Sequence, residues 1–360
     1  ETVLKYDVFR FKERVCEVAT IIDVARYAGV SKSTVSLVLN NSPLVKEETR
    51  IHVEKAIQAL GYVCNNNARG LRTKETKCLG VIIAIERSSA QSYDYNHETG
   101  LYSYNITNGI PDGLLGTDYG LITERYCAKD ANGSLPQAVH NGRIDGAFLV
   151  GGLFDNAIID AILKRGLPTV AVGRYYEQID SVSVDVSAGT KMEVSHLLET
   201  GHRKIAYINC PQIYRSSQDR LCGLQQALEP YNGQVEQTWT AYCAENTGEG
   251  GYLAMKKLWE SGARPDGIAA ANEPIAMGIM RYLYEQKIRI PDDVSVIAYE
   301  DSVLGGYATP ALTTVNIHKE QMGAIAANLL LKRMETPDRP LESRMVQPQL
   351  ILRASVAQRK

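Results

Sequence analysis

The sequence predicts a small all-α segment followed by a larger α/β core of two lobes. Residues 20–62 carry apolar side chains at helical spacing, interrupted at short turns. From residue 79 onwards, short apolar runs alternate with amphipathic stretches. This alternation is typical of βαβ units, in which helices cover both faces of a parallel sheet. The pattern extends over about 280 residues, more than one compact sheet needs, so we expect two lobes.

The first segment is expected to form three short helices. Thr20 can cap the first helix, and Gly29 can adopt the positive φ that a sharp turn between helices requires. The second helix is expected over residues 32–40 and the third over residues 46–60, with Gly61 as its C-cap.

In the core, seven apolar runs are expected to be strands: 79–85, 120–126, 146–150, 169–172, 205–208, 267–271 and 294–298. Five helices are expected between them: 157–165, 188–200, 219–228, 250–261 and 275–286. Ligands of such folds bind beyond the carboxyl ends of the strands, so the cleft between the lobes is the natural site. The polar, Tyr-rich segment 86–107 is expected to be a loop, either mobile at the cleft mouth or simply solvated.

Composition narrows the class of protein. The 360 residues are 44% hydrophobic and 22% charged, which is typical of a globular protein. No apolar run reaches the roughly 18 residues of a membrane span, and residues 1–18 lack the apolar stretch of a secretory signal. Seven cysteines are scattered without a C-x-x-C pair, which favours free thiols in a reducing compartment. We therefore expect a cytoplasmic protein.

Charge is distributed unevenly along the chain. Residues 19–77 hold nine Lys or Arg and five Asp or Glu, a net of +4, whereas residues 78–360 carry −6. A basic segment on an acidic body indicates a nucleic-acid-binding head. Chance variation of surface charge is the alternative explanation of this difference.

Motifs of catalysis are missing from the sequence. It contains no G-x-S-x-G, H-E-x-x-H, G-x-x-x-x-G-K-[ST] or G-x-G-x-x-G pattern, and no cluster with metal-ligand spacing. We therefore expect a protein that is not an enzyme and that holds neither a metal nor another cofactor.

The most specific motif is T-I-I-D-V-A-R-Y-A-G-V-S-K-S-T-V-S-L-V-L-N at residues 20–40. Two helices joined by a tight Gly-containing turn can present the second helix to the DNA major groove. The string resembles the helix-turn-helix of the LacI/GalR family of bacterial repressors. Later segments resemble the same family in the same order: N-N-N-A-R-G-L at 65–71, T-G-H-R-K-I-A at 200–206, R-L-C-G-L at 220–224, A-N-E at 271–273 and P-A-L-T-T-V at 310–315.

The resemblance spans about residues 20–355 and implies a domain organisation. A helix-turn-helix domain would cover 19–62, a hinge 63–77 and a two-lobed, periplasmic-binding-protein-like core 78–355. That core would contain two doubly wound parallel sheets. Residues 1–18 would be an N-terminal extension without an assigned role.

The resemblance also implies DNA-contacting residues. Lys32, Ser33 and Leu37 fall where the family reads bases, and Lys32 can donate to guanine O6 and N7. Leu37 stands where an arginine is common, and its side chain can touch only a thymine methyl group. The expected phosphate contacts are Thr34, Ser36 and Asn40.

In the hinge, the family inserts a leucine into the minor groove, and here that residue is Leu71, with Ala68 beside it. Gly70 lowers the helix propensity of this segment, which favours a hinge that is unfolded away from DNA. Cys64 replaces the usual proline at the start of the hinge. The alternative for Leu71 is a linker residue tucked against the core.

In the core, Arg220 is the strongest effector-binding candidate, because its guanidinium can hold two ligand oxygens at once. A structural salt bridge is the alternative. Asn272 and Glu300 fall at positions that line the family's cleft, Glu300 standing where an aspartate is usual. Arg174 and Asp185 follow apolar runs and are candidates for the cleft, for inter-lobe contacts or for dimer contacts.

Taken with the resemblance, these residues predict a repressor that binds a pseudo-palindromic operator in double-stranded DNA as a homodimer, although a tetramer is also compatible with the sequence. Its effector would be a small molecule, most readily a carbohydrate, bound in the cleft. A sugar-binding transport protein of the same core fold is the alternative, and an enzyme acting in the cleft is a third hypothesis.

Overall fold

The computed structural model describes residues 19–39, 42–62, 75–85, 100–127, 133–151 and 154–359. The chain divides into two compact units between Glu75 and Thr76. The first unit contains helices α1 (Ile21–Ala28), α2 (Lys32–Leu39) and α3 (Glu47–Leu60). All three helices were predicted, each to within about a residue at its ends.

Local chemistry explains where these helices begin and end. The Thr20 hydroxyl accepts from the amide of Asp23, whose carboxylate accepts from the Thr20 amide in return, so a capping box starts α1. Gly29 (φ 65°) and Gly61 (φ 58°) end α1 and α3 in the left-handed conformation. The three helices bury a common core that contains Val24, Val35, Val38, Val53 and Ala56.

The second unit contains two six-stranded sheets, one in each lobe. The first has the order β11-β5-β4-β3-β1-β2 and the second β12-β10-β9-β8-β6-β7. The strands of the first are β1 (Cys78–Ala84), β2 (Gly120–Tyr126), β3 (Gly146–Val150), β4 (Thr169–Val172), β5 (Asp180–Val184) and β11 (Ser343–Val346). Those of the second are β6 (Lys204–Asn209), β7 (Gln237–Tyr242), β8 (Gly267–Ala270), β9 (Ser295–Glu300), β10 (Thr313–Asn316) and β12 (Gln349–Ile351).

The doubly wound topology is as predicted, with one departure from parallel pairing. Every strand pair is parallel except β10 with β12, which is antiparallel. In the second lobe the order reverses between β6 and β8, because the chain leaves β6 for β7 on one side and returns to β8 on the other. Ligands bind at such a switch point, beyond the carboxyl ends of the strands.

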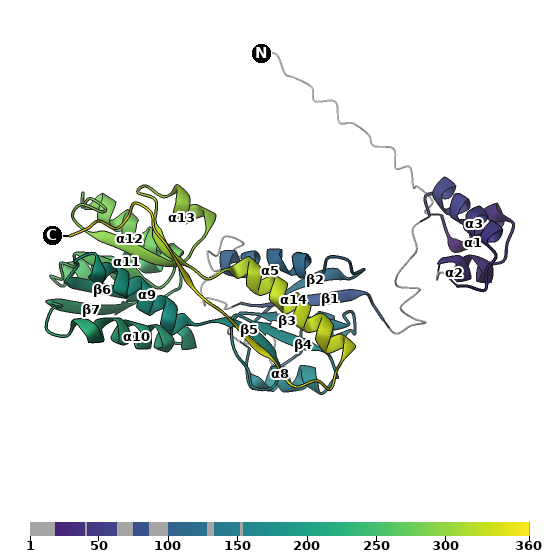
Figure 1. The fold of residues 1–360 in the computed structure, drawn as a ribbon, viewed down its shortest axis with the longest axis horizontal. Coiled ribbons are helices and arrows are strands. Elements are labelled where there is room, and N and C mark those ends of the chain that lie inside the picture. Colours follow the sequence, from purple (N-terminus) through teal and green to yellow (C-terminus); the bar gives the residue numbers. More distant parts are fainter. Residues whose placement is uncertain are drawn as a thin grey trace, which may run out of the picture. The chain divides into compact units, whose positions relative to one another are not determined.

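Helices cover both sheets (Figure 1). They are α5 (Gly100–Gly113), α7 (Gln137–His140), α8 (Asn156–Leu163), α9 (Val186–Glu199), α10 (Arg215–Leu228), the 3₁₀ turn η1 (Glu229–Tyr231), α11 (Gly248–Glu260), α12 (Glu273–Glu285), α13 (Val303–Tyr307) and α14 (Lys319–Glu335). The chain passes between the lobes after β5, after β10 and after β11. Within the described ranges, no helix combines the length and apolar character needed to span a bilayer.

The loop predicted over residues 86–107 is wrong for residues 100–107, which begin α5. This helix lies against α14, as Figure 1 shows. The two helix backbones approach so closely that only glycine fits at two positions. A side chain at Gly109 would collide with the carbonyl of Glu320, and one at Gly323 with the carbonyl of Ile106. The loop was predicted from the polar, Tyr-rich composition of residues 86–107, which hides the helix that begins at Gly100.

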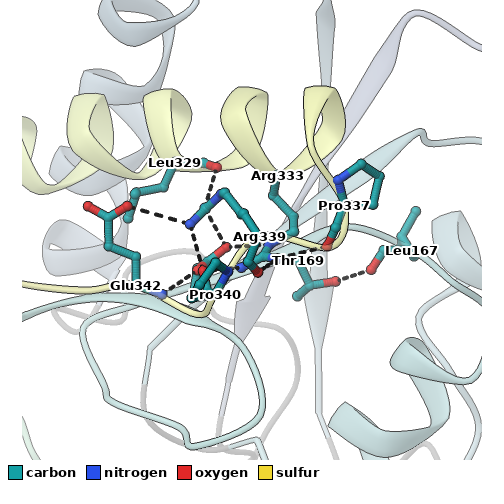
Figure 2. Close-up of polar contacts among 9 residues, drawn as sticks. Leu167, Thr169, Leu329, Arg333, Pro337, Arg339, Pro340 and Glu342 are labelled. Carbon is teal, nitrogen blue, oxygen red and sulfur yellow. Dashed lines mark hydrogen bonds and ion pairs between the residues drawn. The ribbon is translucent and has the colours of Figure 1, made fainter.

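The end of α14 is tied to the first sheet by a buried carboxylate. Asp180, fully buried on β5, accepts from Nε and Nη2 of Arg333 at 2.8 and 3.0 Å and from Nη2 of Arg339 at 2.7 Å. Its Oδ1 also accepts from the amide of Glu342 at 2.7 Å. Figure 2 shows Arg333, Arg339 and the backbone of Glu342 close together below α14. The turn between α14 and β11 is therefore held by charge-assisted hydrogen bonds.

Candidate functional site

Arg220 lies at the switch point of the second lobe. It projects from α10, and its Nε and Nη2 donate to the carbonyl oxygen of Ala271 at 3.2 and 2.8 Å. Its guanidinium lies 4.8 Å from the centre of the Tyr299 ring. The residue is 6% exposed and forms no ion pair with any residue that the structure describes, so the salt-bridge alternative has no support there.

Asn272 follows β8 directly and is buried. Its Oδ1 accepts from the amide of Ile275 at 2.9 Å, which makes it the N-cap of α12, and its Nδ2 donates to Oδ1 of Asn246 at 2.7 Å. The side chain is thus held in place from two sides. Because Ala271 precedes it, the hydrogen bonds from Arg220 fix the backbone next to this cap.

Glu300 ends β9 with a φ of 103°, in the region that L-residues rarely adopt. Its backbone carbonyl accepts from Nζ of Lys319 at 2.5 Å, but its carboxylate has no hydrogen bond to any described residue. Burial raises the pKa of Glu300, while Lys319 and Arg220 act in the opposite direction. The carboxylate is therefore a free acceptor with two cations nearby.

A cavity of about 100 Å³ lies in front of Glu300, between the lobes. Tyr102 and Asn105 of α5 contribute from the first lobe, and Glu273 and Met277 of α12 from the second. The remaining lining residues are Leu101, Pro274, Ser302, Leu304 and Lys319. Sequence reasoning did not assign Glu273, Lys319 or Tyr102 to a site. Lys319 follows β10 by a few residues, so its position after a strand was an available signal.

Lys319 connects the two lobes at this cavity. It is 2% exposed and donates to the carbonyl oxygens of Glu300 and Asp301, at 2.5 and 3.3 Å. It is also the first residue of α14, which packs on α5 in the first lobe. The ammonium therefore holds the edge of one lobe to a helix that belongs to the other.

Asp185 and Arg174 have local roles and do not line the cavity. Asp185 is the N-cap of α9, accepting from the amide of Ala188 at 2.8 Å at the point where the chain leaves the first sheet. Arg174 follows β4, and its guanidinium lies 4.9 Å from the centre of the Tyr176 ring. The structure therefore does not bring these two residues together with Arg220, Asn272 and Glu300.

In the three-helix unit, α2 presents a polar face opposite its buried residues. Lys32 and Ser33 are exposed in its first turn, and Leu37 is 39% exposed. Thr34 is half-buried: its amide donates to Oγ of Ser31 at 3.1 Å and the two hydroxyls lie 2.9 Å apart. Ser36 is also half-buried. The other predicted DNA contacts, Asn40, Ala68 and Leu71, lie outside the described residues.

A helix-turn-helix unit followed by two doubly wound lobes defines the class of bacterial regulators that join a DNA-reading head to a periplasmic-binding-protein-like core. Two family models match the chain, "Bacterial regulatory proteins, lacI family" over residues 20–65 and "Periplasmic binding protein-like domain" over residues 194–356. The chain belongs to the LacI family of transcriptional regulators.

Relatives of known name match along almost the whole chain. The transcriptional repressor PurR of Salmonella paratyphi B is 30% identical over 344 residues, 94% of this chain and 97% of its own. The ribose operon repressor of Haemophilus influenzae is 28% identical, covering 94% and 98%. Among solved structures, the lac repressor dimer bound to operator and the anti-inducer ONPF matches with a TM-score of 0.78 at 26% identity, covering 95% and 100%. A CelR–cellobiose complex matches with a TM-score of 0.65 at 26% identity, covering 94% and 99%.

Proposed function

We propose that this LacI-family regulator represses transcription by binding a pseudo-palindromic operator as a homodimer, under the control of a carbohydrate effector in the inter-lobe cavity. The observation that carries the proposal is the pairing, in one chain, of an exposed recognition face on α2 with a cavity between two lobes that the side chains of Glu273 and Glu300 line. The protein is then a binding switch rather than an enzyme, and it acts in the cytoplasm where its DNA lies.

The DNA-binding half of the proposal rests on the separation of buried and exposed residues along α2. Val35 and Val38 pack the core, which leaves Lys32, Ser33 and Leu37 free to face a base edge. Thr34 and Ser36 carry hydroxyls suited to phosphate oxygens. Because two heads related by a twofold axis read two half-sites, a dimer matches a pseudo-palindromic operator.

The effector half rests on unused hydrogen-bonding capacity at Glu300, which lines the cavity, and at Arg220, which does not line it but acts electrostatically on Glu300. The Glu300 carboxylate can accept from ligand hydroxyls, and the two N–H groups of Arg220 that have no acceptor among the described residues can donate to ligand oxygens. Tyr102 adds an aromatic face from α5. Two relatives with solved structures bind ribose and cellobiose, which agrees with a polyhydroxylated ligand.

The cavity is smaller than the roughly 300 Å³ of an ordinary ligand site, so a sugar is expected to bind with a change in the spacing of the lobes. Such a change has a path toward the hinge. Asp145, just before β3, accepts from the amides of Thr76 and Lys77, both at 2.8 Å, and from the Thr76 hydroxyl at 2.9 Å. Thr76 and Lys77 stand where residues 63–77 join the core, so movement of the first lobe is transmitted to that connector.

The competing functions predict different measurements. A sugar-binding transport protein would bind sugar without salt-dependent affinity for DNA. An enzyme would turn over a bound glycoside. Neither hypothesis uses the exposed face of α2.

The first experiment selects duplexes from a random DNA library with the purified protein and measures their affinity as a function of salt. We expect a twofold-symmetric site, and a binding constant that falls steeply with salt concentration because phosphate contacts release counterions. Selection of asymmetric sites, or of no site, would count against the dimeric repressor.

The second experiment is a thermal-shift screen of mono- and disaccharides that includes D-ribose and cellobiose. A sugar that binds the native state raises the unfolding temperature. The sugar that does so should also change the affinity of the protein for the selected duplex. A stabilising sugar without effect on DNA binding would contradict the proposed coupling.

A further inference from the structure

Glu193 is a fully buried carboxylate that the proposed function does not use. It lies on the inward face of α9, a helix that packs on β8, β9 and β10 in the second lobe. Its Oε1 accepts from the amide of Ala270 at 3.1 Å, and its Oε2 has no hydrogen-bond partner among the described residues. Burial of a carboxylate is costly, so a residue of this kind calls for a physical reason.

The pairing of the strands gives a reason for the burial of Glu193. The pairing of β8 with β9 stops at Ala269, opposite Ile297, while on its other side β8 continues along β6 until the Ala271 amide meets the carbonyl of Ile208. Successive amides point to opposite sides of a strand, so the Ala270 amide faces the side where the pairing with β9 has stopped. Glu193 supplies the acceptor that β9 no longer provides.

Arg220 holds the next residue along the same strand. Its Nε and Nη2 donate to the carbonyl oxygen of Ala271, one residue beyond the amide that Glu193 accepts. An acidic side chain from α9 and a basic side chain from α10 therefore hold the consecutive residues Ala270 and Ala271, just before the Asn272 cap of α12; we call this arrangement the clasp. The first turn of α12, with Glu273, lines the cavity.

The two side chains also interact through space. Burial raises the pKa of Glu193 well above its ordinary value, and Arg220 acts in the opposite direction. Tyr299 lies against both: its ring is under the Arg220 guanidinium, and its pKa, raised by burial, is raised further by Glu193. Gly189, one turn before Glu193 on α9, makes room for this ring, because a side chain there would collide with it.

We propose that Glu193 is a positioning residue of the effector site, which holds Arg220 and the end of β8 in the geometry that the effector meets. This inference rests on the proposed effector site for its consequence, but the clasp itself exists without any ligand. A ligand oxygen bound by Arg220 would then depend on a side chain that does not touch it. The clasp also gives a reason for the burial of Glu193.

Two variants separate positioning from simple core packing. Glu193→Gln keeps the Oε1 acceptor and the shape of the side chain, so it should preserve the clasp. Glu193→Met keeps the length but removes the acceptor, and an apolar replacement of a buried polar group is usually compatible with folding. If the residue only filled space, the two variants would behave alike.

The first readout needs neither DNA nor sugar. Hydrogen–deuterium exchange of the Ala270 amide, and of the Arg220 Nε–H in ¹⁵N-arginine-labelled protein assigned with Arg220→Lys, should be similar in wild type and Glu193→Gln. In Glu193→Met both should exchange roughly tenfold faster, the change expected for one lost hydrogen bond. Equal protection in the Met variant would overturn the proposal.

The second readout measures the shift in unfolding temperature that D-ribose and cellobiose cause in each variant. We expect any shift seen in wild type to persist in Glu193→Gln and to fall in Glu193→Met. A shift that survives undiminished in Glu193→Met would overturn the positioning role. If neither sugar shifts the unfolding temperature of wild type while the exchange rates differ as expected, D-ribose and cellobiose are excluded as effectors. The hydrogen-bonding role of Glu193 is still supported in that case.

Discussion

The guanidinium of Arg220 lies over the ring of Tyr299, 4.8 Å from its centre, and donates two of its N–H groups to the carbonyl oxygen of Ala271. The planar, forked guanidinium can lie over a ring and donate two hydrogen bonds to one carbonyl oxygen at the same time. A lysine ammonium cannot reproduce this geometry. The residue thus has a packed face and donors left for a ligand.

Arg220→Lys should therefore keep the charge but lose the effector response. We expect the affinity for the sugar found by thermal shift to fall by about 10- to 100-fold, the equivalent of one charge-assisted hydrogen bond, with operator affinity unchanged. Arg264→Lys is the matched control, since Arg264 is exposed and lies 4.4 Å from the Trp259 ring, away from the cavity. A response of Arg220→Lys at the wild-type sugar concentration would contradict the assignment.

Glu273 links stability to pH. Its Oε2 accepts from the amide of Ser302 at 2.8 Å, and its Oε1 has no partner among the described residues. Burial raises the pKa of Glu273 to about 7, with Glu300 adding to the rise while Ser302 and Lys319 oppose it. The folded protein thus binds this proton more tightly than the unfolded chain does. Protonation of Glu273 therefore stabilises the folded state at low pH, and this stabilisation is lost as the pH rises from about 4.5 through 7.

Glu273→Gln removes this titration. Relative to wild type, the variant should gain roughly 3 kcal/mol in free energy of unfolding between about pH 4.5 and pH 8. Urea unfolding at the two pH values measures the difference. Glu260→Gln, on an exposed pair with Lys256, should show no such gain. Equal pH dependence in wild type and Glu273→Gln would contradict the prediction.

The three-helix unit could be predicted because its signals are local. Thr20, Gly29 and Gly61 each act within a few residues of themselves, and the structure confirms all three as helix caps. Strand β5 was not predicted, because most of its buried residues are polar. Asp180, Ser181 and Ser183 are buried there, with Asp180 satisfied by arginines more than 150 residues away in sequence, and no local pattern encodes such partners.

Only part of the candidate site was predicted, because some of its residues carry a local motif and others depend on partners distant in sequence. Arg220, Asn272 and Glu300 follow from the family motif. In the structure Arg220 bonds to Ala271, beside Asn272, and of the three only Glu300 lines the cavity. Glu193 carries no motif, and its role depends on where β9 stops pairing with β8. Asp185 was predicted as a candidate contact because it follows an apolar run, but a residue there can equally cap the next helix, as it does here.

Leu37, which we propose as a base-reading residue, can be exchanged without disturbing the fold. It is 39% exposed, while Val35 and Val38 provide the packing of α2. Leu37→Arg should therefore change the free energy of unfolding by less than about 1 kcal/mol. It should also move the selected operator toward guanine at one position of each half-site, because arginine donates to guanine O6 and N7. Repeating the duplex selection measures this, and an unchanged consensus would exclude Leu37 from base reading.

Leu71, in the proposed hinge and outside the described residues, gives a prediction that comes from the sequence alone. If its side chain wedges into the minor groove, Leu71→Ala removes the wedge and should weaken operator binding by about tenfold or more, with sugar affinity unchanged. Fluorescence anisotropy with the selected duplex measures the first quantity and the thermal shift the second. Unchanged operator affinity would favour the alternative, a leucine tucked against the core.

Asp180 and Arg333 supply the last prediction, which concerns stability alone. Asp180→Asn keeps the shape of the side chain but leaves the guanidinium of Arg333, 11% exposed, without its counter-charge, and that of Arg339, 15% exposed, with Glu342 alone at 3.5 Å. Breaking a buried pair from one side costs about 3–5 kcal/mol, so the urea midpoint should fall by the corresponding amount. Glu260→Gln, which breaks an exposed pair, should cost less than about 1 kcal/mol. Because Asp180 lies on β5 and does not line the cavity, folded Asp180→Asn should bind its sugar and operator with wild-type affinity. A cost as small as that of Glu260→Gln would mean that solvent compensates the two arginines.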